Sequence, residues 1–143
     1  MPERLDARTR RHVAERAAFR CEYCQTPSAL SPSPYSAEHI LPRRRGGTNR
    51  PENLALSCQG CNGHKGVRTA ALDPATGRTV PVFNPRKQMW AEHFVWAEGG
   101  MRIEGVTACG RATVAALQLN RVGLQNLRRL MLLAEIHPAD QAK

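Results

Sequence analysis

The chain has 143 residues, with 21 Lys or Arg against 12 Asp or Glu and a formal charge of +9, and this length is typical of a single domain. It contains no run of about 18 apolar residues, which excludes a membrane-spanning helix, and its polar, Arg-rich start lacks a secretory signal, so we expect a cytoplasmic protein. The charge indicates a polyanionic partner, most often nucleic acid, or a basic surface that is only solvated.

The N-terminal half is predicted to begin with a helix over 5–19. Asp6 is a suitable N-cap for it, and apolar residues recur at every fourth position. Prolines and glycines then mark loops, and short alternating segments indicate strands. In chain order the further elements are a loop over 26–35, a strand over 36–41, a loop over 43–51, a strand over 53–57 and the start of a helix over 61–67.

The C-terminal half is predicted to contain a turn-rich segment, a hairpin and helices. Trp90, Phe94 and Trp96 are expected in its core rather than as platforms for bases. The predicted elements are turns over 70–80, a short helix from the Asn84-Pro85 cap to 90, a hairpin of 93–97 with 101–105, a helix from the Thr107 cap to 119, and a last helix over 124–134 before Pro138. The expected fold is α+β, a single domain over 1–143 whose residues 80–143 form a C-terminal hairpin–helix extension.

Four of the five cysteines form two pairs with identical spacing, Cys21 with Cys24 and Cys58 with Cys61. Two intervening residues let both sulfurs of a pair bind one ion at about 2.3 Å. Four cysteines complete a tetrahedral zinc shell and leave no position for a substrate, so we predict a structural Zn²⁺ site. The alternative is four unrelated buried thiols. Cys109 stands alone and is interpreted as a small residue that opens a helix.

The stretch from Cys21 to Gly66 carries further motifs, which read CEYC, AEHILPRRRGG, NLALSC and CNGHKG in order. This series resembles the HNH endonuclease family, in the form whose ββα-metal (His-Me finger) core is held together by four cysteines. The resemblance implies a zinc-stapled nuclease module over 21–68, with a helix before it. It also implies metal-dependent hydrolysis of DNA phosphodiester bonds, with double-stranded DNA as the expected partner.

The family's functional residues carry over by motif position. His39 would be the general base, since a neutral imidazole can take a proton from water near pH 7. Glu38 and Asn62 would bind a catalytic divalent cation, Mg²⁺, Mn²⁺ or another, through their oxygen atoms. Asn53 would organise the loop between the strands and help to orient the base. Glu38 could instead be a surface carboxylate or pair with an arginine of the loop, Asn62 could be only a helix cap, and His64 is a lesser candidate ligand.

Basic residues flank these positions, and Arg43, Arg44, Arg45 and Lys65 are expected to contact phosphates; the alternative for the arginines is a solvated loop. Consecutive strand residues point to opposite faces of a sheet. Glu38 and His39 can therefore share a site only across a strand end or a strong twist.

Two other functions stay open at this point. A non-catalytic, zinc-dependent DNA-binding module is the main alternative, although such a protein has no need of a base beside oxygen ligands. RNA as substrate is a third reading, and the lack of a stacking-aromatic motif counts against it. A monomer or a homodimer is compatible with the sequence.

Overall fold

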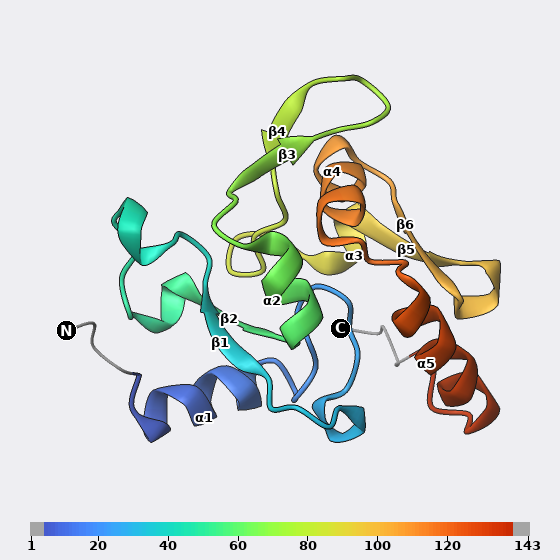
Figure 1. Ribbon diagram of the computed structural model, residues 1–143, viewed down its shortest axis with the longest axis horizontal. Helices are drawn as coiled ribbons and strands as arrows, with labels where there is room; N and C mark the ends of the chain where they lie inside the picture. Colours follow the sequence, from blue (N-terminus) through green and yellow to red (C-terminus); the bar gives the residue numbers. More distant parts are fainter. Residues whose placement is uncertain (1–4, 139–143) are drawn as a thin grey trace. The chain divides into compact units, whose positions relative to one another are not determined.

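The computed structural model describes residues 5–138, and its helices and small antiparallel sheets confirm the predicted α+β class (Figure 1). Its contacts divide the chain into two compact units. Unit 1 consists of the described residues of Met1–Thr69 together with Asn84–Lys87, and unit 2 of Ala70–Phe83 with the described residues of Gln88–Lys143. The two ends of the predicted domain, 1–4 and 139–143, lie outside the described residues.

Unit 1 is built on a two-stranded antiparallel sheet with a helix before and after it in the chain. Its elements are α1 (Ala7–Arg16), η1 (Ser28–Leu30), β1 (Ser36–His39), η2 (Arg43–Arg45), η3 (Pro51–Asn53), β2 (Leu54–Ser57) and α2 (Gln59–Lys65). In the register of the sheet, Ser36 lies opposite Ser57 and His39 lies opposite Leu54. β1, β2 and α2 thus follow in the predicted strand–strand–helix order.

α1 packs its apolar face against the sheet. Val13, Leu54 and Leu56 form the buried cluster. The Arg16 guanidinium donates to the carbonyl of Leu54 at 2.7 Å. Asp6 caps the helix as predicted, since its carboxylate accepts the amide of Thr9 at 2.7 Å. One small apolar cluster and one arginine therefore hold α1 in place.

Unit 2 combines two hairpins with three helices. Its elements are β3 (Ala70–Leu72), β4 (Thr79–Pro81), α3 (Trp90–His93), β5 (Phe94–Ala97), η4 (Glu98–Gly100), β6 (Arg102–Gly105), α4 (Ala108–Leu117) and α5 (Val122–Leu133). Phe83 and Phe94 meet edge to face at 5.3 Å between ring centres. Arg128 is fully buried, donates to the Leu119 carbonyl at 2.6 Å and lies over the Trp96 ring. The predicted hairpin, the Thr107 cap and the last two helices are present.

Two segments differ from the prediction. The turn-rich stretch 70–80 contains the β3–β4 hairpin, whose turn is tied by the buried Asp73. Arg111 of α4 donates two hydrogen bonds of 3.0 Å to this carboxylate and, with the turn's own donors, lowers the pKa of Asp73. A contact distant in sequence therefore stabilises strands too short to show periodicity.

The predicted helix from Asn84 to Trp90 was wrong. The Asn84 side chain accepts the amide of Arg86 at 2.9 Å, and its carbonyl accepts the amide of Lys87 at 3.1 Å, which makes a turn. The Arg86 side chain binds Glu22 and the Leu54 carbonyl within unit 1. Since these contacts hold the segment in unit 1, the chain cannot continue as one helix into unit 2, where α3 begins only at Trp90.

Among the helices of the described residues, none has the length and the apolar composition that crossing a membrane requires.

Candidate functional site

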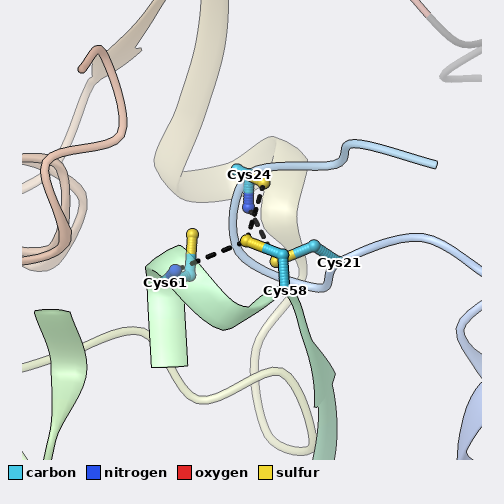
Figure 2. Close-up of side chains that lie close together, drawn as sticks. All are labelled: Cys21, Cys24, Cys58 and Cys61. Atoms are coloured by element: carbon cyan, nitrogen blue, oxygen red, sulfur yellow. Dashed lines mark hydrogen bonds between the residues drawn. The ribbon is translucent and has the colours of Figure 1, made fainter. Parts of the chain in front are cut away.

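The four paired cysteines converge on one point of unit 1 (Figure 2). The sulfurs of Cys21, Cys24, Cys58 and Cys61 all lie within 4.8 Å of one another. Sulfurs that share one tetrahedral zinc ion stand about 3.8 Å apart, and Cys24 and Cys58 are separated by 3.8 Å. All four side chains are buried. The donor chemistry and the spacing both fit Zn²⁺, so the predicted four-cysteine cluster is present and could hold this ion.

Local backbone geometry prepares each cysteine pair for the metal. The amide of Cys24 points at the Cys21 sulfur at 3.5 Å, and the amide of Cys61 points at the Cys58 sulfur at 3.4 Å. Such bonds stabilise the thiolate form. Hydrogen bonds from Cys21, Cys24 and Cys61 lower the pKa of Cys58, so a metal-binding thiolate is favoured at that position.

A second centre lies where β1 ends. Here an open hollow of about 430 Å³ brings Glu38, His39 and Asn62 together. The complete lining is Ser36, Ala37, Glu38, His39, Pro42, Arg43, Arg44, Asn62, Gly66 and Val67. His39 is the last residue of β1, so the two neighbouring side chains can reach one space at a strand end although they alternate along the strand.

Glu38 is held by two partners from different elements. The hydroxyl of Tyr23 donates to its Oε1, and the ammonium of Lys65 lies 3.3 Å from its Oε2. Only 5% of Glu38 is exposed. This burial raises the pKa of Glu38, while Lys65 and Tyr23 act in the opposite direction. Glu38 is therefore a buried, oriented carboxylate and not the surface residue of the alternative reading.

His39 has one ring nitrogen fixed by the loop that follows β1. Its Nε2 lies 2.7 Å from the Oδ1 of Asn49. An amide oxygen can only accept a hydrogen bond, so Nε2 carries the proton and Nδ1 keeps its lone pair. Asn49 was not singled out from the sequence, where it is one polar residue of a loop without a distinctive pattern.

Asn53 ties the ends of the same loop together. Its Oδ1 accepts the amide of Leu41 at 2.9 Å, and its Nδ2 donates to the carbonyls of Leu41 and Thr48 at 3.0 and 2.9 Å. Gly47 is needed here, because a Cβ at this position would lie 1.7 Å from the Leu41 carbonyl oxygen. Asn53 does not line the hollow.

The oxygen donors at the hollow can be compared with what a divalent cation needs. Mg²⁺ and Mn²⁺ bind carboxylate, amide and water oxygens. Glu38 and Asn62 both line the hollow, and each oxygen of Glu38 retains a lone pair beyond the one that its partner uses. The donor set therefore fits a hard cation. His64 lies on α2 but does not line the hollow.

The basic residues of the sequence prediction separate into two groups. Arg43 and Arg44 are exposed at the rim of the hollow, and Arg45 is exposed and donates to Thr69. Lys65, in contrast, is fully buried and binds Glu38 and the carbonyl of Ile40. The prediction that Lys65 contacts phosphate was wrong for this structure, because a buried ammonium paired with a carboxylate is not available to a ligand.

The HNH endonuclease family model matches residues 21–68 of the chain. No curated protein and no solved structure matches it. The match supports a nuclease in general and implies a nucleic-acid partner. Both cysteine pairs fall inside the matched segment, and so do Glu38, His39 and Asn62 of the hollow and the loop-tying Asn53. The match to the HNH endonuclease family model therefore covers residues 21–68, the same segment that carries the motifs of the sequence.

Proposed function

We propose that the chain is a metal-dependent endonuclease that hydrolyses phosphodiester bonds of double-stranded DNA at the hollow beside His39. The observation that carries this proposal is that a histidine with one ring nitrogen fixed and two oxygen donors line one basic-rimmed hollow. The module 21–68 would then be a ββα-metal nuclease core, and residues 80–143 would form its hairpin–helix extension.

His39 would act as the general base through Nδ1. Asn49 holds Nε2, so the ring is oriented and in the tautomer whose Nδ1 can accept a proton from the attacking water. Asn53 would keep this arrangement by fixing the loop that carries Asn49. The general base and the residues that position it thus come from β1, the loop and η3.

Glu38 and Asn62 would hold the catalytic divalent cation. When bound, the cation supplies positive charge to the phosphate and to the leaving oxygen. Arg43 and Arg44, at the rim, would bind the DNA backbone beside the scissile phosphate. The sequence ranges 1–69 and 84–87 contain 14 of the 21 Lys and Arg residues but only half of the acidic ones, which favours this part of the chain as the surface for a polyanion.

Purified protein with bound zinc should cut supercoiled plasmid when Mg²⁺ or Mn²⁺ is added, and EDTA should stop the reaction. Gel separation of supercoiled, nicked and linear forms measures the outcome and shows whether one or both strands are cut. Protein that shifts DNA in a gel but cuts none with any divalent cation would establish the non-catalytic binding module instead.

Neutralising Arg43, Arg44 and Arg45 together should weaken DNA binding for all sequences. Each lost phosphate contact removes about 0.9 from the slope of log affinity against log salt, so we expect a slope flatter by up to about three. Fluorescence anisotropy over a salt series measures it. A control that neutralises the exposed Arg78, Arg102 and Arg129 of unit 2 removes equal charge. If both triple variants flatten the slope equally, the loop has no special role.

A further inference from the structure

The partners of Glu38 come from the two segments that also carry the cysteine pairs. Tyr23 lies between Cys21 and Cys24 in the first pair. Lys65 is the last residue of α2, the helix that Cys58 caps and whose first turn contains Cys61. Each oxygen of the carboxylate is therefore held by an element that the zinc site fixes.

The Tyr23 side chain is enclosed by the protein, and its neighbour in the chain is tied to β2. Tyr23 is 1% exposed, and its neighbour Glu22 binds the backbone of Leu56 on β2 from both its amide and its carboxylate. Burial together with the nearby Glu38 charge raises the pKa of Tyr23, so its hydroxyl remains a donor. A fixed donor of this kind leaves the carboxylate little rotational freedom.

The Lys65 contact follows from helix geometry. Cys61 and Lys65 are four residues apart on α2 and so share one face of the helix. Both are fully buried. The ammonium also donates to the Ile40 carbonyl at 3.2 Å, just beyond the end of β1. Lys65 therefore joins α2 to the residues that flank Glu38 and His39.

We propose that Tyr23 and Lys65 are positioning residues that hold the Glu38 carboxylate in the orientation from which it binds the divalent cation, so that the zinc site sets the affinity of the cation site. This inference rests on the proposed function for the role of Glu38. It makes the four cysteines a determinant of cation binding and not only of folding. Partners of a metal-binding side chain commonly change metal affinity by about 10- to 100-fold when they are removed.

The first test measures Mn²⁺ binding without DNA, by the electron paramagnetic resonance signal of the free ion. Tyr23→Phe keeps the ring and removes only the hydroxyl, so we expect about 10-fold weaker Mn²⁺ binding with one zinc per chain retained. The control is Tyr35→Phe, since the Tyr35 hydroxyl donates to the carbonyls of Thr26 and Pro27 near the same cysteines. Its Mn²⁺ affinity should stay within about 2-fold of the parent.

The second test needs no substitution at the site. Tyr23 and Tyr35 are the two tyrosines of the chain, so incorporation of 3-fluorotyrosine gives two fluorine resonances, which the Tyr35→Phe variant alone assigns. Addition of Mg²⁺ to the zinc-loaded protein should move the resonance of residue 23 and leave that of residue 35. This measurement tests the positioning role of Tyr23 even if the Tyr23→Phe variant fails to fold.

The results separate this inference from the nuclease proposal. Unchanged Mn²⁺ affinity in a zinc-containing Tyr23→Phe protein, or a residue-23 resonance that Mg²⁺ does not move, overturns the positioning role. Parent protein that binds no Mn²⁺ overturns it as well. If Tyr23→Phe binds Mn²⁺ less tightly than the parent, and the parent cuts no DNA, the positioning role is supported and the nuclease is rejected.

Discussion

Replacing His39 with alanine should slow DNA cleavage by about two to four orders of magnitude, which is the usual contribution of a general base. The substitution removes no cysteine, no proposed cation ligand and no member of the buried cluster of unit 1. The variant should therefore fold, retain its zinc and bind DNA with the affinity of the parent. Single-turnover cleavage under saturating Mg²⁺ or Mn²⁺ measures the loss.

The matched control is His12→Ala, which removes an exposed imidazole from α1 of the same unit. Its cleavage rate should equal that of the parent. A second variant, Asn49→Ala, keeps the base but frees its Nε2, so we expect a smaller loss than for His39→Ala. Cleavage by His39→Ala at the parental rate would show that another group takes the proton.

Replacing Cys58 with serine should abolish the folding of unit 1. The apolar cluster of this unit is small, with Val13, Leu54 and Leu56 as its buried members, and in such proteins the free energy of zinc binding supplies the free energy of folding. Cys58 also caps α2 through its sulfur. Elemental analysis of the parent should find about one zinc per chain, and circular dichroism with thermal unfolding should show the loss in the variant.

The control for this substitution is Cys109→Ser, in unit 2, where the half-buried thiol contacts Gln88 and is no part of the cysteine cluster. It should keep the zinc content of the parent. Chelation of zinc from the parent should reproduce the effect of Cys58→Ser. A protein that folds and cuts DNA without zinc would contradict both the metal assignment and the stability argument.

The elements that could be predicted from the sequence are those that local chemistry determines. Asp6 and Thr107 cap their helices because a side-chain oxygen and an amide three residues later suffice for the bond. The hairpin across Gly99 forms at a glycine with φ +65, a conformation that glycine adopts without strain. The β3–β4 hairpin and the turn at Asn84 depend on Arg111 and Glu22, which are distant in sequence, so local patterns could not reveal them.

The site shows the same division. The four cysteines lie together as their spacing predicts. His39 and Asn62, which were singled out by motif position, line one hollow. The contacts of Lys65 depend on which way the end of α2 faces, and spacing does not contain that information. Tyr23 lies between the two cysteines of the first pair. Its position beside the metal site is a sequence signal that could have indicated a hydrogen-bond partner for Glu38.

The return of residues 84–87 to unit 1 bears on how the proposed nuclease centre can be moved to another protein. Arg86 and Arg16 both bind the Leu54 carbonyl, and Arg86 also neutralises Glu22 between the first two cysteines. A graft of 21–68 alone would carry every proposed metal-binding residue, but it would leave the Leu54 carbonyl without these two arginines and expose the apolar side that Val13 covers. A transferable unit must therefore combine two separate segments of the chain, and its ends lie outside the matched residues 21–68.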